Sequence, residues 1–170
     1  IKACGVAQFN ADIKMPPNTL QLAVVYSTQH HALIKSVDTA AALKMPGVVG
    51  VMTSEDIKGT NRIRFSVPDN PLLCEDRVRV VGDPIIAIAA KTRDQARAAA
   101  AAVKVAYEPL PVILSMEEAT APGAFQIHSH APNNIGASQP LIKGDADKAL
   151  KEAKTVVEAD FSTQTNHQAP

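Results

Sequence analysis

The stretch from Val78 to Pro111 constrains the fold most, because it predicts a strand, a helix and a second strand in direct succession. Residues 84–90 form a nearly unbroken apolar run, which is typical of a strand that is buried on both faces. Thr92 and Gln95 then give the Thr-x-x-Gln pattern of a capping box, which marks the start of a helix. The chain therefore has one central strand that is followed at once by a helix.

The predicted helix has a buried face made almost entirely of alanine. Its apolar side chains recur at the i, i+3, i+4 and i+7 spacing of one helix face, at Ala96, Ala99, Ala100 and Val103. Such small side chains allow the helix to lie close to a sheet. A second strand is predicted over residues 103–107, before Pro109 and Pro111. This unit forms a core, but it contains no set of side chains suited to catalysis.

Strands and short helices mix along the rest of the chain without strict alternation. This mixture predicts the α+β class, with a mixed sheet and short helices, rather than a doubly wound α/β fold. Strands are predicted over residues 5–12, 20–26, 32–37, 48–53 and 155–163, and short helices over residues 39–44, 116–121 and 146–154. Asp145 is the predicted cap of the last of these helices.

Length and charge limit the classes of protein to which the chain can belong. Its 170 residues suffice for one domain, or for one domain and the start of another. The 17 basic and 17 acidic residues balance, so there is no basic field for nucleic acid or for an anionic membrane. No apolar run is long enough to span a bilayer. We therefore expect neither nucleic acid nor a membrane as a partner.

The two cysteines, Cys4 and Cys74, lie far apart in the sequence and neither has a neighbouring cysteine. This pattern favours two free, buried thiols over a disulfide. Free thiols indicate a reducing compartment, so we expect a cytoplasmic location in preference to a periplasmic one. The chain begins at Ile1 and ends at Pro170 after a strand-like run, and we interpret it as part of a longer protein.

Two segments lack periodicity and contain many helix and strand breakers. Residues 57–76 form a long loop of the kind that is usually functional or packed on something else, and we favour packing against a neighbouring domain. Residues 125–143 are also irregular and are interpreted as an interdomain connector.

Histidines are the main candidates for chemistry. His30 and His31 are adjacent, so on extended chain they point to opposite sides and do not easily share a metal ion. His128 and His130 would lie on one side of a strand, and His167 could complete a three-histidine site. No carboxylate or cysteine accompanies them at a useful spacing, so a solvated or interface pair is the favoured interpretation.

The other candidates have simpler structural explanations. Glu117 and Glu118 are neighbours on a predicted helix and do not face each other, and Glu118 fits a capping box with Ser115. Lys91 and Lys104 flank the central helix and are expected to be solvated. The sequence contains no Gly-rich phosphate cradle and no nucleophile elbow. It therefore predicts no catalytic, cofactor-binding or metal-binding residue in this chain.

Five motifs occur in a specific order. They are Gly5-x-Ala7-x-Phe9-x-x-Asp12, Ser27-x-x-x-His31-Ala32-x-Ile34-x-Ser36-Val37-Asp38, Met45-Pro46-Gly47-Val48-x-Gly50-Val51-Met52-Thr53-x-x-Asp56, Pro71-Leu72-Leu73-x-x-Asp76-x-Val78-x-x-x-Gly82-x-Pro84 and Val103-x-Val105-x-Tyr107-Glu108-x-Leu110-Pro111. This pattern resembles the a/b hammerhead domain of the molybdenum hydroxylases, the xanthine dehydrogenase and aldehyde oxidase family. Within that family it looks most like the aldehyde oxidoreductases of sulfate-reducing bacteria.

The resemblance continues after the hammerhead. Gly144-Asp145-x-x-x-Ala149-x-x-x-Ala153, Val156-Val157-Glu158-x-x-Phe161-x-Thr163 and His167 look like the segment that leads into the family's molybdenum-binding domain. The resemblance therefore implies a hammerhead domain over residues 1–122, a connector over 123–143 and the start of a molybdopterin-binding domain over 144–170.

The resemblance also implies the activity of the whole enzyme, which would oxidise aldehydes to carboxylic acids. Such an enzyme holds a molybdopterin dinucleotide and two [2Fe-2S] clusters, and no residue of this chain matches a family ligand or catalytic residue. This chain alone is therefore expected to be inactive and architectural, with the remaining domains of the same enzyme as partners and a homodimer left open. Three alternatives remain: another molybdenum hydroxylase of the xanthine, nicotinate or carbon monoxide type, a free-standing interaction module, and a small metal-dependent hydrolase using His128, His130 and His167.

Overall fold

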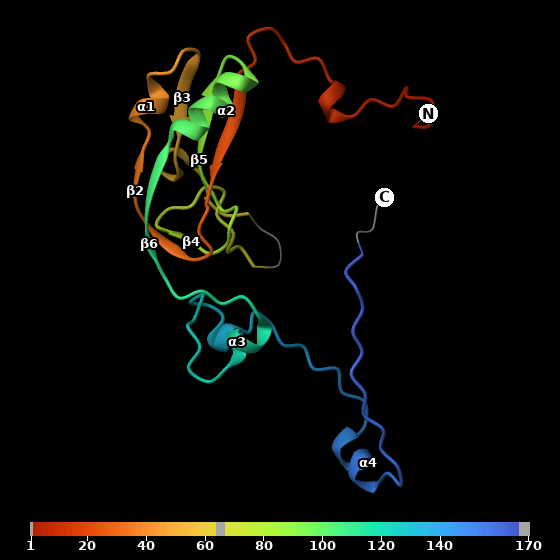
Figure 1. Ribbon diagram of the computed structural model, residues 1–170. Helices are drawn as coiled ribbons and strands as arrows, with labels where there is room; N and C mark the ends of the chain where they lie inside the picture. Colours follow the sequence, from red (N-terminus) through yellow and green to blue (C-terminus); the bar gives the residue numbers. More distant parts are fainter. Residues whose placement is uncertain (1, 64–66, 167–170) are drawn as a thin grey trace.

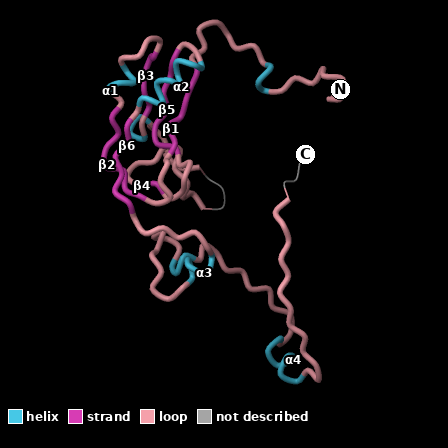
Figure 2. The backbone as a smooth tube through the Cα atoms, in the orientation of Figure 1, coloured by secondary structure: helices cyan, strands magenta, loops and turns pink. Residues whose placement is uncertain are grey.

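A computed structural model describes residues 2–63 and 67–166 of the chain (Figure 1). Its main body contains two three-stranded sheets, and irregular chain dominates after the last strand (Figure 2). The strands are β1 Gln21–Tyr26, β2 Ala32–Asp38, β3 Val48–Met52, β4 Arg77–Val78, β5 Pro84–Ala90 and β6 Lys104–Pro109.

The six strands are divided alternately between the two sheets. One sheet has the order β1-β5-β3 and the other has the order β4-β2-β6, so odd-numbered strands lie in one and even-numbered strands in the other. All four strand pairs are antiparallel. In the first sheet, Ile88 of β5 lies opposite Ala23 on one side and Val51 on the other. The predicted α+β class is confirmed, since no parallel βαβ unit occurs among these strands.

Strand β5 is the centre of the core, as its apolar run predicts. Ile85, Ile86 and Ile88 are at most 2% exposed, because β1 and β3 cover both edges of β5 and other elements cover its faces. Burying each such side chain contributes about 1.5–3 kcal/mol relative to leaving it in water.

Helix α2 (Arg93–Ala102) follows β5 and contacts β1 and β5. The Thr92 hydroxyl accepts a hydrogen bond from the Gln95 amide at 3.3 Å, which confirms the predicted cap. Ala96 and Ala99 are fully buried, so the alanine face does lie against the sheet. The helix then leads the chain into the other sheet. The next strand, β6, pairs with β2 and not with β5.

A tight turn before β3 also fits against α2. Gly47 has a φ of +81°, in the left-handed region, and its carbonyl accepts a hydrogen bond from the Lys91 amide at 2.9 Å. The space that a Cβ atom would need at Gly47 is filled by the side chain of Gln95. Glycine is therefore favoured here by the backbone conformation, and a larger residue would also require the end of the Gln95 side chain to move.

The remaining helices are short. The Ser115 hydroxyl accepts from the Glu118 amide at 3.1 Å, and Asp145 Oδ1 accepts from the Lys148 amide at 2.9 Å, so both predicted caps are confirmed. The helices are α1 Ala40–Leu43, α3 Met116–Thr120 and α4 Ala146–Glu152, with 3₁₀ turns η1 Asn10–Asp12, η2 Ser54–Asp56 and η3 Pro132–Asn134.

Two predicted strands are wrong. Residues 5–12 form an extended stretch that ends in η1, and Val6 and Phe9 are 68% and 60% exposed. Residues 155–163 pair with no strand in the described part of the chain, and Phe161 is 92% exposed. An alternating pattern describes the faces of a strand but does not supply a partner edge, so it cannot by itself form a ladder.

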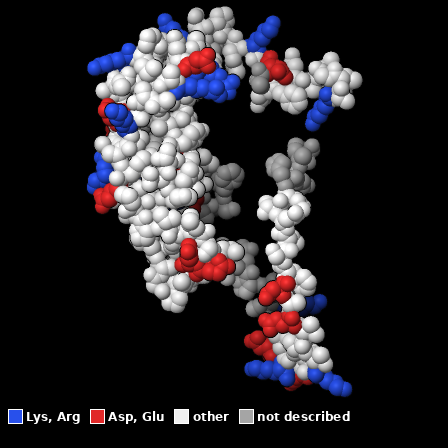
Figure 3. Space-filling view, in the orientation of Figure 1, with Lys and Arg blue, Asp and Glu red and all other residues white. Residues whose placement is uncertain are grey.

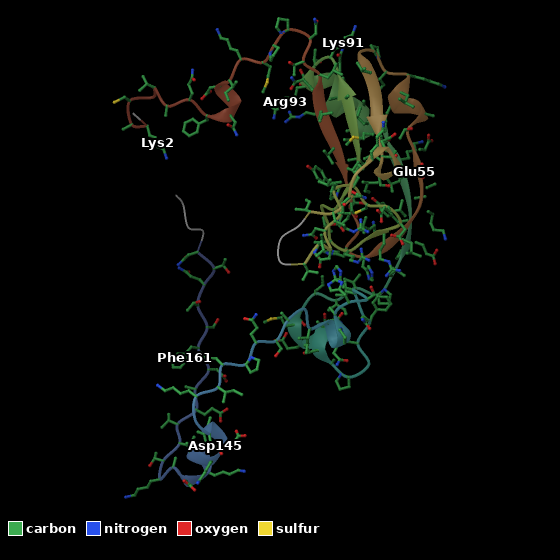
Figure 4. All side chains as sticks on the ribbon, turned by 180° about the vertical axis from the view of Figure 1, so that it is seen from behind. Lys2, Glu55, Lys91, Arg93, Asp145 and Phe161 are labelled. Atoms are coloured by element: carbon green, nitrogen blue, oxygen red, sulfur yellow. The ribbon has the colours of Figure 1, made fainter. Side chains whose placement is uncertain are left out.

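The C-terminal segment lies apart from the sheets. Figure 1 shows α4 and the chain after it apart from the main body, and Figure 4 shows Asp145 and Phe161 on this segment, far from Lys91 and Arg93 at the opposite end. Both signs of charge gather around α4 in the view of Figure 3. Within the described residues, no helix has the length and apolar character that crossing a membrane requires.

The two thiols have different environments. Cys74 is buried at 4% exposure, as expected, and burial is the main reason that its pKa rises to about 12. Cys4 is exposed, so the prediction that both thiols are buried is wrong for this residue. Both cysteines are free.

Candidate functional site

One carboxylate and two imidazoles come together where the loop over residues 67–71 meets the connector. Asp69 Oδ2 lies 3.6 Å from His130 Nε2 and 3.9 Å from His128 Nδ1. One ligand atom from each of the three residues lies within 4.8 Å of the others. The two imidazole rings have centroids 5.3 Å apart and planes inclined by 58°. We refer to Asp69, His128 and His130 as the Asp–His–His cluster.

The two histidines are held on a compact turn, not on the strand that would have placed them on one side. The Gln126 side-chain amide donates to the carbonyls of His128 and Ser129, at 3.0 and 3.2 Å. The Ala131 amide also donates to the His128 carbonyl, at 3.1 Å. Because these bonds fix the backbone on both sides of Ser129, they fix the positions from which both imidazoles project.

Asn134 ties the same turn to α3. Its side-chain carbonyl accepts from the Ile127 amide at 2.8 Å, and its Nδ2 donates to the carbonyls of Ala119 and Phe125, both at 2.9 Å. Arg79 joins the turn to the main body, because its Nε donates to the Ile127 carbonyl at 3.3 Å. Residues 125–134 are therefore folded against the main body.

An open pocket of about 460 Å³ surrounds the Asp–His–His cluster. Burial, followed by the positive charge of Arg79, lowers the pKa of His128, so this imidazole is neutral at pH 7 and offers a lone pair. The charged side chains that line the pocket are Arg62, Arg77, Arg79, Asp69, Glu75 and Asp76.

The loop that carries Asp69 is braced at its base. Arg62 donates from Nη1 and Nη2 to the two carboxylate oxygens of Glu75, at 3.1 and 3.0 Å. Asn61 and Leu73 exchange two hydrogen bonds, at 2.7 and 3.1 Å. The hydrogen bonds from Arg62 are the main cause of a lowered pKa at Glu75. These hydrogen bonds thus hold the start and the end of the long loop together.

His31 has a structural environment quite different from that of His30. His31 is buried, its Nδ1 lies 2.6 Å from the Pro111 carbonyl oxygen, and its ring meets Phe125 edge to face with centroids 5.2 Å apart. A carbonyl only accepts, so Nδ1 carries the proton. His30 is exposed. Among the described residues, neither histidine belongs to a group of side chains that could hold a metal ion.

The other sequence candidates lie in ordinary positions. Glu118 caps its own helix, since its Oε2 accepts from the Leu114 amide at 2.9 Å. Lys91 and Lys104 are exposed, as expected. His167 lies outside the described residues, so a three-histidine site is not part of this description.

Sequence reasoning noted His128 and His130 as a pair but favoured a solvated or interface pair, and it did not associate Asp69 with them. Asp69 is remote in the sequence from His128, and only the fold of the long loop brings the two together. The sequence feature that pointed to this region was the irregularity of residues 57–76 and 125–143, which predicts that these segments pack against other parts of the protein. These two segments contact each other at the cluster, whereas the sequence-based hypothesis placed their contacts with neighbouring domains.

The chain is similar to known proteins over most of its length. The sequence model of the family described as aldehyde oxidase and xanthine dehydrogenase, a/b hammerhead domain, matches residues 4–111. Aldehyde oxidoreductase of Megalodesulfovibrio gigas is 41% identical over 172 residues, covering 94% of this chain and 19% of that protein. The nicotinate dehydrogenase large molybdopterin subunit of Eubacterium barkeri is 38% identical, covering 95% of this chain and 37% of that subunit.

A solved structure shows the same similarity in three dimensions. Aldehyde oxidoreductase from Desulfovibrio gigas superimposes with a TM-score of 0.81 at 40% identity, covering 91% of this chain and 18% of that chain. The chain thus spans about a fifth of the length of the aldehyde oxidoreductases that it matches. The structure has two antiparallel sheets joined by an alanine-faced helix, and the sequence matches the family over residues 4–111. The chain belongs to the aldehyde oxidase and xanthine dehydrogenase family and contains its a/b hammerhead domain.

Proposed function

We propose that this chain serves as the hammerhead domain of a molybdenum-dependent enzyme that oxidises aldehydes to carboxylic acids. The observation that carries the proposal is the 41% identity to an aldehyde oxidoreductase over 94% of the chain. That similarity extends beyond residue 111, where the family model ends, into the connector and the segment that contains α4. The domain division proposed is 1–122 for the hammerhead, 123–143 for the connector and 144–170 for the start of a molybdopterin-binding domain.

The role proposed for this chain is architectural, with the remaining domains of the same enzyme as its partners. Apolar side chains on the C-terminal segment support this role, because Leu141 is fully exposed and Phe161 nearly so. Side chains of this kind indicate a surface that packs against other protein. Leu141, Ile142, Leu150, Val156, Val157 and Phe161 form this apolar set.

The iron-sulfur clusters of such an enzyme do not fit this chain. A [2Fe-2S] cluster takes four cysteine thiolates, and the chain has two cysteines. One of these, Cys74, is buried with a pKa of about 12 and therefore disfavours the thiolate form. We propose that both clusters and the molybdopterin dinucleotide are held by other parts of the protein, and that this chain alone is inactive.

The experiment is a mass measurement on the protein from its native source, with molybdenum and iron quantified on the same sample and aldehyde oxidation followed with a dye acceptor. We expect a mass several times 18.0 kDa, both metals bound and acid formed from aldehyde. Oxidation of xanthine, nicotinate or carbon monoxide in place of aldehyde would change the substrate class. A native mass of 18.0 kDa without molybdenum would replace the proposal with an interaction module.

Two further properties are proposed with this function. The free thiol of Cys4 is exposed and would persist in a reducing compartment, which supports a cytoplasmic location in preference to a periplasmic one. Fractionation of native cells tests this assignment. A homodimer is the proposed assembly to test, by light scattering on the intact enzyme.

A further inference from the structure

We propose that Asp69, His128 and His130 bind a divalent transition-metal ion of the zinc class, at a site separate from the proposed molybdenum chemistry. The inference starts from three ligand atoms that converge on one point from two segments far apart in the sequence. It depends only on the geometry of the described residues and does not require the proposed function.

The distances within the cluster suit a bridging ion better than direct hydrogen bonds. Asp69 Oδ2 is 3.6 and 3.9 Å from the two imidazole nitrogens, beyond hydrogen-bond length in both cases. Tetrahedral zinc with ligands at about 2.0–2.1 Å separates neighbouring ligand atoms by about 3.3 Å. The two distances from Asp69 exceed this spacing by about 0.3 and 0.6 Å, and all three ligand atoms lie within 4.8 Å of one another, so side-chain rotation would bring them to coordination geometry.

The donor set selects the class of metal ion. Two imidazole nitrogens with one carboxylate oxygen suit zinc, cobalt, nickel and copper, whereas magnesium and calcium prefer all-oxygen sites. The pocket does not repel a cation, because Arg62, Arg77 and Arg79 are balanced by Asp69, Glu75 and Asp76. The side chains of Asp69, His128 and His130 are 31%, 30% and 42% exposed, so the site is open to solvent for entry of the ion and for a fourth ligand.

The ligands are also held by their surroundings. The turn that presents His128 and His130 is fixed by Gln126, and the connector is fixed to the body by Arg79. The loop that presents Asp69 is closed at its base by the Arg62–Glu75 pair. Because both sides are positioned before the ion arrives, binding requires little ordering of the chain.

The ion would link the hammerhead to the connector. Asp69 belongs to the long loop of the main body, and both histidines belong to the segment that leads toward α4. In the absence of the ion, the contacts between Asp69 and the two imidazoles are longer than hydrogen bonds and lie at a partly exposed surface, so they contribute little. A bound ion would replace them with three coordinate bonds.

Zinc binding by the native-length protein tests the proposal. Equilibrium dialysis against micromolar zinc chloride, with zinc counted by mass spectrometry, compares the wild type with Asp69→Asn, His128→Gln and His130→Gln. His30→Gln and Asp160→Asn are matched controls, because they remove an exposed imidazole and an exposed carboxylate elsewhere. Zinc-dependent change in the melting temperature is recorded on the same samples as a second measurement.

We expect each cluster variant to lose one zinc equivalent, or to bind it at least about tenfold more weakly, while both controls keep it. The wild type should also melt at a higher temperature with zinc, and Asp69→Asn, which keeps the shape of this partly exposed side chain, should not. Equal zinc content in the wild type, the cluster variants and the controls would overturn the proposal, as would equal stabilisation by zinc in all of them.

Discussion

The Nδ1 atom of buried His31 lies 2.6 Å from the carbonyl oxygen of Pro111, a residue 80 positions further along the chain. His31 stands immediately before β2, and Pro111 follows β6, the strand that pairs with β2. The Leu110 amide adds a second bond in the same place, to the His31 carbonyl at 3.0 Å. The histidine predicted to be a poor metal ligand therefore has a structural role, since it closes one end of the β2–β6 ladder.

Replacing His31 with leucine should destabilise the protein by about 1–3 kcal/mol, because the Pro111 carbonyl would lose its buried donor. Urea unfolding followed by circular dichroism measures the change. His30→Gln is the control, with an expected effect within about 0.5 kcal/mol for an exposed position. Equal stability of the His31 and His30 variants would contradict a structural role for the bond.

Ile88→Ala should cost about 2–5 kcal/mol of unfolding free energy, because Ile88 is fully buried in the central strand. The cost combines lost apolar burial with the cavity left between β1 and β3. Val49→Ala, at a position that is 56% exposed on β3, should change stability far less. Thermal unfolding of the two variants gives the comparison, and similar losses at both positions would argue against β5 as the core strand.

Gly47→Ala should destabilise the protein by at least about 1–2 kcal/mol, the usual cost of placing a side chain in the left-handed region. The added methyl group would also meet the Gln95 side chain. Adding Gln95→Ala should recover only the second part of the loss, since it leaves φ unchanged. Gly50→Ala is the control, because a Cβ there meets no atom within 4 Å.

The Arg62–Glu75 pair should make the free energy of unfolding depend weakly on pH in the acidic range. The pKa of Glu75 is lowered in the folded protein, so the stabilisation is present above the unfolded pKa of about 4.3 and is lost as pH falls through the folded value. Both side chains are more than a third exposed, so the pair contributes at most about 1 kcal/mol.

Urea unfolding of the wild type and Glu75→Gln at pH 7 and pH 3 measures this dependence. The difference between the two proteins should shrink at pH 3, because this pH lies below the unfolded pKa of about 4.3 and protonation removes the stabilisation as the pH falls toward the folded value. Glu158→Gln, at an exposed position on the C-terminal segment, serves as the matched control. A difference that grows in acid would contradict the role assigned to the pair.

The two thiols should react at very different rates. Cys4 is exposed and should be labelled by a thiol reagent at pH 8 within minutes, whereas Cys74 is buried with a pKa of about 12 and should react only after unfolding. Labelling with and without urea, counted by intact mass, distinguishes one label from two. Two labels in the folded protein would show that the core around Cys74 opens readily.

The sequence predicted the elements whose signals are local. The apolar run of β5, the Thr92 cap of α2 and the caps at Ser115 and Asp145 depend on neighbouring residues, and the structure confirms each of them. The predicted strands over residues 5–12 and 155–163 failed because a strand also needs an edge to pair with. Periodicity carries no information about such a partner.

For the candidate site too, local patterns in the sequence were informative and long-range contacts were not. His128 and His130 were identified from their spacing, although the segment is a turn and not a strand. Asp69 was missed because its approach depends on how the long loop closes through Asn61, Arg62 and Glu75. A carboxylate in one irregular segment and two histidines in another form a pattern that is visible only after folding.

The alternate division of strands has a consequence for synthesis on the ribosome. Each sheet receives every second strand, so β1 and β3 have no shared partner until β5, which lies between them, has been made, and the other sheet is incomplete until β6 pairs with β2. The first four strands therefore cannot complete either sheet. We expect the β1-β5-β3 sheet to close once β5 has left the exit tunnel and the other sheet to close after β6, and the emerging strands to depend until then on chaperones that shield unpaired edges.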